Sequence, residues 1–251
     1  MSAPEELDAQ VRRTDPDRWL ATRLVADPVR RAELVALYAL NDELATVAEH
    51  VSTPMLGDIR LAWWREGLEG LAGGEARAHP VLQALAPAAG EGRLDLERLL
   101  AGVEARALDL EAEPFADEAA LTAYIDATAG AMMAVAARLL DPAARAGATA
   151  SAARAWGWAR LWRAAPAFAA RGRRWVPVAW AEAEEGEIAA HVRHRVLDAL
   201  DAAQGELKAL PVAAFPAVAY ATLARPFALG REPGELGKRA RLLAATVRGR
   251  V

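Results

Sequence analysis

Few side chains in this sequence have the types and spacing that covalent catalysis requires. The 251 residues contain no Cys, which excludes disulfides, thiolate metal sites, iron–sulfur clusters and a Cys nucleophile. The three serines, Ser2, Ser52 and Ser151, lie outside a nucleophile-elbow context, which argues against a Ser-His-Asp triad. No Gly-rich loop is followed by Lys and Ser or Thr, so a phosphate-binding P-loop is excluded.

A zinc site is the first metal chemistry to weigh. His191 and His194 are three residues apart and could share a helix face with Glu187, which would give two imidazoles and one carboxylate. Arg193 and Arg195 flank both histidines and would repel a cation. We therefore favour a solvated helix face over a metal site.

Tryptophan and arginine are concentrated in one stretch. Five of the eight tryptophans lie there, interleaved with arginines: Trp156, Trp158, Trp162, Trp175 and Trp180, with Arg154, Arg160, Arg163, Arg171, Arg173 and Arg174. The pattern could stack on bases, lie in a lipid interface or line a pocket for an anionic, apolar ligand. The interpretation favoured by the pattern alone is that tryptophans fill a core among small alanines while arginines reach outward.

Composition limits the class of protein. Apolar residues make up 54% and charged residues 25%, which predicts one globular domain with a sizeable core. A formal charge of −4 argues against a general nucleic-acid binder. We find no uninterrupted apolar run of the roughly 18–20 residues that span a bilayer, and residues 1–10 do not resemble a secretory signal. We expect a cytoplasmic protein, soluble or peripheral to the inner membrane.

The elements that must position these residues are all helical. Apolar residues recur at three- and four-residue spacing, and Pro and Gly punctuate the segments. We expect helices at 29–51, 54–71, 80–86, 95–110, 117–140, 143–168, 186–204, 212–227 and 235–247, with a loop at 171–174. No hairpin signature is present. The prediction is a single all-α domain over residues 1–251.

Three segments, in order along the chain, resemble the squalene/phytoene synthase superfamily. The first covers residues 37–41 and 51–65, which end in Leu-Ala-Trp-Trp-Arg. The second covers residues 108–110, Tyr124 and residues 129–130, and the third runs from residue 161 to 177. The match is strongest over residues 17–177. The resemblance implies an isoprenoid-synthase-type helical bundle with a central cavity.

Active members of that superfamily join two prenyl diphosphates head to head, and the resemblance implies where their metal would be held. Two motifs with aspartates four residues apart hold Mg²⁺ against the diphosphate. The first motif's positions are here Ala45, Thr46 and Glu49, and the second's are Ala164 and Phe168. No two aspartates of this chain are four residues apart. We expect no metal and no cofactor, with Mg²⁺ only if the protein is an active enzyme.

The basic and aromatic part of the superfamily pattern is retained. Six residues match positions that line the pocket or approach the diphosphate in active members: Tyr38, Arg60, Tyr124, Arg163, Arg171 and Arg173. The resemblance implies that they could form a residual pocket for an isoprenoid diphosphate or another anionic lipid. The alternative is that they are retained for packing alone.

Residues 15–24, with Asn41 and the run Glu43-Leu44-Ala45, are similar to a branch of the superfamily that lacks the metal ligands. That branch includes the mitochondrial respiratory complex I assembly factor and its bacterial relatives. The resemblance implies a non-catalytic protein that binds an isoprenoid or lipid, or assists assembly through a respiratory-complex or other protein partner. Two alternatives stay open: an active head-to-head prenyltransferase, and a peripheral membrane module built on the Trp- and Arg-rich stretch.

Overall fold

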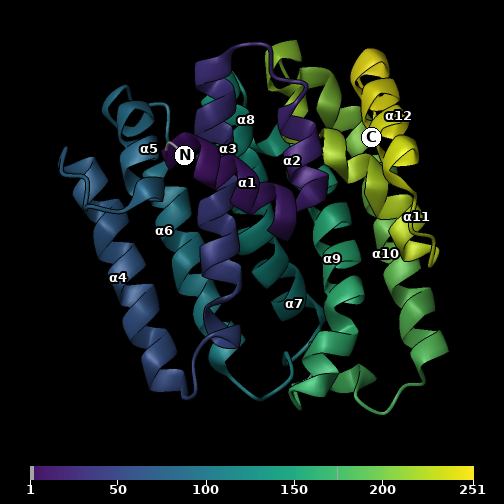
Figure 1. Ribbon diagram of the computed structural model, residues 1–251. Helices are drawn as coiled ribbons and strands as arrows, with labels where there is room; N and C mark the ends of the chain where they lie inside the picture. The colour runs from purple at the N-terminus through teal and green to yellow at the C-terminus, as the bar shows by residue number, and fades with distance from the viewer. Residues whose placement is uncertain (1–2, 174) are drawn as a thin grey trace.

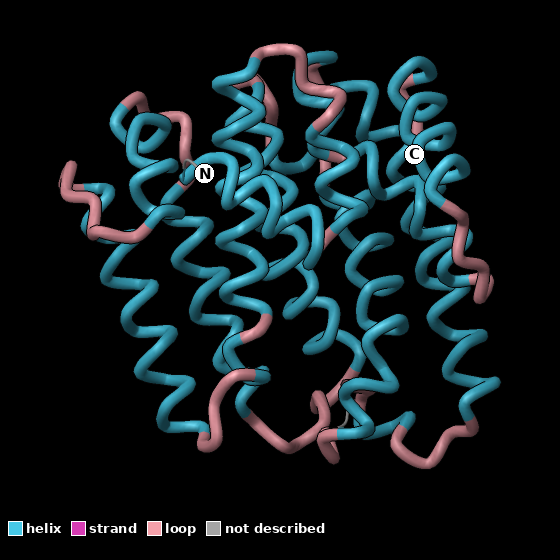
Figure 2. Tube along the Cα trace, in the orientation of Figure 1, coloured by secondary structure: helices cyan, strands magenta, loops and turns pink. Residues whose placement is uncertain are grey.

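The computed structural model describes residues 3–173 and 175–251, and helices make up its regular structure (Figure 1). The α-helices are α1 (Ala3–Thr14), α2 (Pro16–Thr22), α3 (Pro28–Ala45), α4 (Pro54–Ala72), α5 (Pro80–Gly90), α6 (Leu96–Ala105), α7 (Glu118–Ile125), α8 (Ala131–Leu140), α9 (Ala150–Ala170), α10 (Glu185–Glu206), α11 (Ala224–Ala228) and α12 (Glu235–Arg248). No strand occurs among these residues, as Figure 2 shows, which confirms the all-α prediction.

Side-chain caps and prolines set where the helices begin. Asp15, Asp27 and Asp117 each accept a hydrogen bond from a backbone N–H in the first turn of α2, α3 and α7. A proline occupies the first turn of α2, α3, α4 and α5, where its missing N–H costs nothing. The predicted start of α4 at Pro54 is confirmed, and this proline lies in the first turn of the helix.

Helix α3 is the centre of the core. Every residue from Glu33 to Asn41 is buried, because α1, α5 and α8 pack around this helix. Glu33 is the charged exception, and Arg93 neutralises it through two hydrogen bonds of 2.7 and 2.8 Å. In Figure 1, α4 and α5 flank α3 on one side, and α9 and α10 lie on the other.

Several predicted boundaries are wrong, each for a local reason. The helix predicted at 29–51 ends at Ala45, where Thr46 Oγ1 donates to the Asp42 carbonyl and a 3-10 turn, η1 (Val47–Glu49), follows. The helix predicted from 143 begins at Ala150, after the 3-10 turn η4 (Ala146–Ala148). The predicted helix 95–110 changes into the 3-10 segment η2 (Arg106–Leu110).

The segment predicted as one helix at 212–227 is broken. It consists of two 3-10 segments, η7 (Val212–Ala217) and η8 (Ala219–Leu223), followed by α11. Pro216 and Pro226 lie within it and lack the N–H that a continuous α-helix would use. Helices α1 and α2 were not predicted.

The predicted stretch 117–140 forms one helical column with an irregular middle. A π-helical turn, η3 (Asp126–Gly130), joins α7 to α8. By length and composition the segment Glu118–Leu140 could cross a membrane, but 56% of its apolar window is buried inside the fold. The core helix of a globular protein passes the same test.

Most of the clustered tryptophans fill the core. Trp156 and Trp158 are fully or almost fully buried, and Trp175 and Trp180 are each 9% exposed. Trp162 is half-buried and packs against the core. The packing interpretation of these tryptophans is therefore confirmed for four of the five.

Candidate functional site

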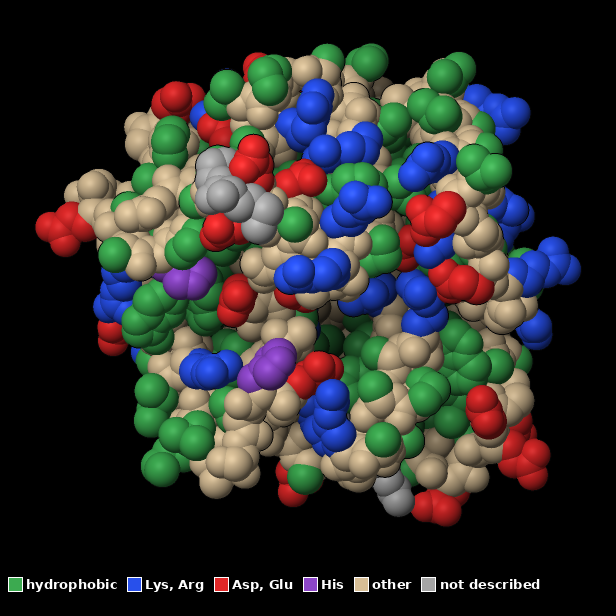
Figure 3. Space-filling view, viewed as in Figure 1, with side chains coloured by type: hydrophobic (Ala, Val, Ile, Leu, Met, Phe, Trp, Pro, Cys, Tyr) green, Lys and Arg blue, Asp and Glu red, His purple; other side chains and the backbone are tan. Residues whose placement is uncertain are grey.

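A cavity of about 420 Å³ lies between α3 and α9, and Thr14, Asp15 and Arg18 line it from the end of α1 and the start of α2. Its walls come from the C-terminal part of α3, from η1 and η2, from α7 and η3, and from the face of α9 that carries Gly157, Leu161 and Phe168. We call it the central cavity. In Figure 3, the side of the molecule that faces the viewer has a hollow near its middle, with Lys and Arg side chains gathered around it.

Both predicted metal-motif segments meet at this cavity. Ala45, Thr46 and Glu49 line it from the end of α3 and from η1, and Ala164 and Phe168 line it from α9. Glu49 is already paired within the cavity wall, because its carboxylate accepts a hydrogen bond of 2.8 Å from Arg171. This ion pair joins η1 to the loop after α9.

A network of three side chains forms a second part of the wall. Arg106 donates to Tyr124 Oη over 2.9 Å and to Asp109 Oδ2 over 3.1 Å, and Tyr124 donates to Asp109 Oδ1 over 2.7 Å. Burial raises the pKa of Tyr124, Arg106 opposes the shift, and Asp109 adds to it. The phenol stays protonated at neutral pH and is held as a donor to the carboxylate.

A buried ion pair at the start of α2 lines the cavity. Arg18 Nη1 lies 2.8 Å from Asp15 Oδ2, and both side chains are 4% exposed. The guanidinium lies over three aromatic rings, at 5.1 Å from Tyr220, 5.6 Å from Trp156 and 5.7 Å from Tyr38. Burial alone would raise the pKa of Asp15, but the charges of Arg18 and Arg160 and the hydrogen bonds from Arg18 outweigh it and lower the pKa.

Arg160 lines the cavity one turn before Ala164 on α9. Among the described residues it has no hydrogen bond and no ion pair. Arg160 is an exposed residue of α9, and its charge is attracted by Asp15 and Asp17 and repelled by Arg18 and Arg163. The superfamily resemblance does not include Arg160. In the sequence it is one of the arginines interleaved with the clustered tryptophans, four residues before Ala164.

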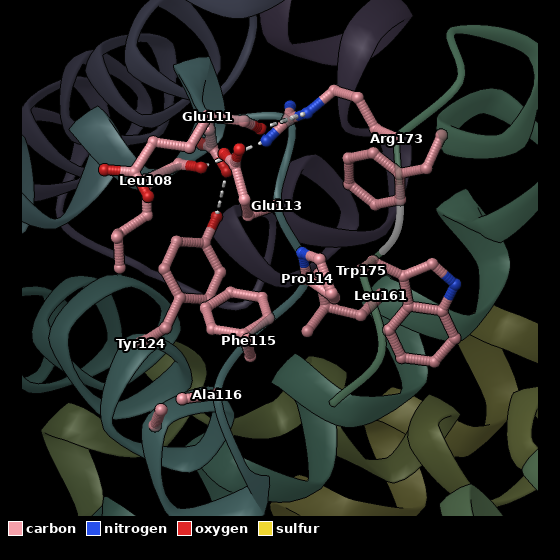
Figure 4. A pocket seen from close by; sticks show the side chains of 13 residues that line it. Leu108, Glu111, Glu113, Pro114, Phe115, Ala116, Tyr124, Leu161, Arg173 and Trp175 are labelled. Atoms are coloured by element: carbon pink, nitrogen blue, oxygen red, sulfur yellow. Dashed lines mark hydrogen bonds between the residues drawn. The ribbon is translucent and has the colours of Figure 1, made fainter. Parts of the chain in front are cut away.

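An adjoining cavity of about 330 Å³, the side chamber, shares five lining residues with the central cavity: Asp109, Tyr124, Leu161, Phe168 and Arg173. Pro114, Phe115 and Trp175 make much of its wall apolar (Figure 4). Arg173 stands between the two spaces and donates to the carbonyl oxygens of Leu108 and Glu111 over 3.1 and 3.3 Å.

The structure brings together only part of the predicted ligand pocket. Tyr124, Arg171 and Arg173 line the central cavity. Tyr38 is fully buried behind it, edge-on to Tyr220. Arg174 lies outside the described residues.

Two predicted pocket arginines lie elsewhere. Arg163 points to another groove, where it pairs with Asp17 at 3.2 Å and with Glu232 at 3.3 Å. Arg60 lies on an exposed face of α4 and is not among the residues that line the central cavity.

The two histidines considered for a zinc site contact other side chains of the fold. His191 stacks on Trp180 with ring centroids 4.7 Å apart, and His194 contacts Asp198 at 2.8 Å. Within residues 3–173 and 175–251, no group of three or more His, Asp or Glu side chains is arranged to hold a metal ion.

A single all-helical domain around a central cavity, with α3 and α9 on opposite walls, is the architecture of isoprenoid synthase structures. The crystal structure of a dehydrosqualene synthase in complex with ligand superposes with a TM-score of 0.82 at 11% identity, over 98% of this chain and 96% of that chain. Squalene synthase HpnC from Alicyclobacillus acidocaldarius gives a TM-score of 0.69 at 20% identity, over 98% and 94%. At these identities the likeness shows the fold alone.

The sequence profile of the squalene/phytoene synthase family matches residues 11–231. Because this match covers most of the chain, the protein belongs to the squalene/phytoene synthase family. No curated protein sequence matches the chain.

Proposed function

We propose that this protein binds an isoprenoid diphosphate or a similar amphipathic anion in the central cavity and does not catalyse metal-dependent prenyl transfer. The observation that carries the proposal is the set of side chains on the two walls where the family's metal motifs would lie. Ala45, Ala164 and Phe168 occupy those walls and offer no ligand oxygen. Glu49 is bound to Arg171.

The residues present do not fit a magnesium site that could neutralise a diphosphate. Mg²⁺ takes oxygen ligands, and in phosphoryl and diphosphate sites it is held by carboxylates. Four carboxylates line the cavity, but they form no metal-binding group with one another among the described residues: Asp15, Asp42, Glu49 and Asp109. Burial raises the pKa of Asp42 above its ordinary value.

The two connected cavities suit an amphipathic ligand. The central cavity carries five arginines, and the side chamber offers Phe115, Leu161 and Trp175 to an apolar chain. Their volumes of about 420 and 330 Å³ fall within the range of roughly 300–1,000 Å³ that is usual for small-molecule sites.

A thermal-shift titration with farnesyl diphosphate, with EDTA or with Mg²⁺, tests the proposal. At one hundred times its dissociation constant a ligand adds roughly 2.7 kcal/mol to stability, which for this size predicts a rise in Tm of a few degrees. We expect that rise in EDTA and no further rise with Mg²⁺. No rise in EDTA would contradict the binding proposal.

The alternative is an active head-to-head prenyltransferase, supported by the four carboxyl groups that line the central cavity. Incubating the protein with farnesyl or geranylgeranyl diphosphate and Mg²⁺, followed by measurement of released pyrophosphate, separates the two. We expect no release above the buffer. Release that requires both protein and Mg²⁺ would overturn the non-catalytic half of the proposal.

One surface favours an additional role through a protein partner. Met55, Leu56, Ile59 and Trp63 form an apolar stripe along one face of α4, and these side chains are 38–68% exposed. An exposed apolar patch of this kind is typical of an interaction site. With the resemblance to the assembly-factor branch, the stripe supports a role in respiratory-complex assembly, with a partner subunit covering α4.

A further inference from the structure

Helix α12 buries one face and exposes an apolar face on its opposite side. Lys238, Leu242 and Ala245 are buried where the helix packs against α2 and η8. The opposite face follows the four- and three-residue spacing of a helix and consists of exposed residues: Leu236, Ala240, Leu243 and Val247. The Leu236, Leu243 and Val247 side chains are 80%, 55% and 86% exposed. We call these four residues the outer face of α12.

Ion pairs hold the outer face away from the core. Lys238 Nζ lies 2.9 Å from Asp17 Oδ1 and 2.7 Å from Glu232 Oε1, and the Lys238 side chain is 7% exposed. These pairs fix the rotation of α12 about its own axis, so the outer face is directed into the solvent. A contiguous exposed apolar patch is typical of a surface that contacts a protein or a membrane.

Arginines border the outer face on both sides. The helical spacing places Arg239 along one edge and Arg241 and Arg248 along the other. All three are exposed, and within residues 3–173 and 175–251 their side chains form no hydrogen bond and no ion pair. Only two acidic residues lie between positions 231 and 251: Glu232, which pairs with Lys238, and Glu235.

The positive charge of this surface is local. The whole chain carries a formal charge of −4, so basic residues do not dominate the protein as a whole. In Figure 3, Lys and Arg side chains gather along the right edge of the molecule, where Figure 1 shows α12. The partner of this surface is therefore expected to be both apolar and anionic.

We infer that α12 lies on the surface of a bilayer that contains anionic lipids, with its outer face among the acyl chains. The aliphatic side chains leave water there, while arginines on both edges reach back to the lipid phosphates. Protein interfaces are enriched in aromatic side chains, and the outer face has none. Nucleic acid would pair with the arginines and leave the aliphatic side chains in water.

Membrane contact through α12 goes beyond the proposed function and does not depend on a ligand in the central cavity. It also uses a surface apart from the exposed apolar stripe of α4, because α4 and α12 lie on opposite sides of the molecule (Figure 1).

Sedimentation of the purified protein with lipid vesicles tests this surface. One set of vesicles contains phosphatidylcholine alone, and the other contains equal parts of phosphatidylcholine and phosphatidylglycerol. We expect binding to the second set and little binding to the first. Because salt screens exposed charges, about 1 M NaCl, where the Debye length is about 3 Å, should release most of the bound protein.

The triple variant Arg239→Gln, Arg241→Gln and Arg248→Gln removes the charged edges. Each basic residue near an anionic membrane contributes about fivefold in affinity, so this variant should bind the anionic vesicles on the order of a hundredfold more weakly. Replacing the same three residues with Lys keeps the charge, and that variant should stay within about fivefold of wild type.

The double variant Leu243→Glu and Val247→Glu changes the outer face itself. Two carboxylates would have to enter the acyl region, so vesicle binding should fall at least about tenfold. Both side chains are more than half exposed, so the Tm of the free protein should be retained. The matched control is Val29→Glu with Val212→Glu, outside α12, where the side chains are 62% and 88% exposed. It should bind vesicles as the wild type does.

Each result decides the role of α12. Failure of the wild type to sediment with anionic vesicles would overturn the inference, as would wild-type binding by the Leu243→Glu and Val247→Glu variant. Equal binding to both lipid compositions would overturn the role of the arginines. Binding to a single-stranded RNA oligonucleotide without binding to vesicles would replace the bilayer with nucleic acid. The thermal shift with farnesyl diphosphate should persist in every variant, so loss of vesicle binding leaves the proposed function standing.

Discussion

At the scale of single residues, the central cavity is lined by five arginines that differ in the groups they contact. Asp15 forms an ion pair with Arg18 inside a shell of aromatic rings, and the charge of Arg160 on α9 also lowers the pKa of Asp15. Breaking a buried ion pair by removing one partner costs about 3–5 kcal/mol, because the remaining charge is left in the interior. Asp15 is therefore a residue on which stability depends.

We expect Asp15→Asn to lower the free energy of unfolding at pH 7 by about 3 kcal/mol, measured by urea denaturation. The folded-state pKa of Asp15 lies below its ordinary value of 3.8, so its contribution is complete above that pH. The contribution is lost as the pH falls through the folded-state pKa, so the gap between wild type and variant should narrow at pH 3. Asp58→Asn, exposed on α4, should stay within about 0.5 kcal/mol of wild type at both pH values. A gap that is constant from pH 7 to pH 3 would contradict this prediction.

Sequence alone predicted part of the site at this scale. Tyr124, Arg171 and Arg173 could be placed by resemblance, and all three line the central cavity. Arg163 could not be placed, because its acceptors Asp17 and Glu232 are 146 and 69 residues away in the chain. Arg160 is one of many arginines in the sequence, and its place on the cavity wall follows only from the folded chain.

At the scale of elements, α9 must approach the column of α7, η3 and α8 closely to form a wall of the central cavity. Gly157 lies at the closest approach, where an added Cβ would clash with Ile125 Cγ2 and lie 3.3 Å from Ala129 Cβ. The absence of a side chain at 157 is therefore what lets the helix pack against the π-helical turn.

Gly157→Ala should lower the free energy of unfolding by about 1–3 kcal/mol, since overpacking of this kind forces the two helices apart. Gly205→Ala on α10 is the matched control, because nothing lies within 4 Å of the added Cβ. Alanine has a higher helix propensity, so the control should be neutral or more stable by up to about 1 kcal/mol. Chemical denaturation of the two variants checks both values, and a Gly157→Ala variant as stable as wild type would refute the close-packing argument.

The type of each long helix could be predicted, and the departures from α geometry could not. Helix α4 was predicted at 54–71 because Pro54 and Gly73 bound a periodic segment. The 3-10 segments at 212–223 carry the same apolar spacing as an α-helix, and Pro216 lies inside the first of them. Periodicity identifies a buried helical face and does not distinguish between 3.0 and 3.6 residues per turn.

At the scale of the whole molecule, the surfaces that we propose for ligand binding and for partner binding are separate. The central cavity lies between α3 and α9, whereas α4 lies at the edge of the molecule (Figure 1) and buries its opposite face, with Leu61 and Trp64, against its neighbours. The stripe of Met55, Leu56, Ile59 and Trp63 remains in contact with water. A change on the stripe should therefore leave the cavity intact.

The double variant Met55→Glu and Ile59→Glu tests the partner role in the source organism. Both side chains are more than half exposed, at 68% and 58%, so the fold and the farnesyl diphosphate shift should be retained. Two charges on the stripe would have to be desolvated on docking, so the variant should fail to restore assembled respiratory complex I when the chromosomal gene is deleted. The control is Val29→Glu with Val212→Glu, where the side chains are 62% and 88% exposed. Full restoration of the complex by the α4 variant, or no loss of it on deletion of the gene, would remove the assembly role and leave ligand binding as the function that this fold supports.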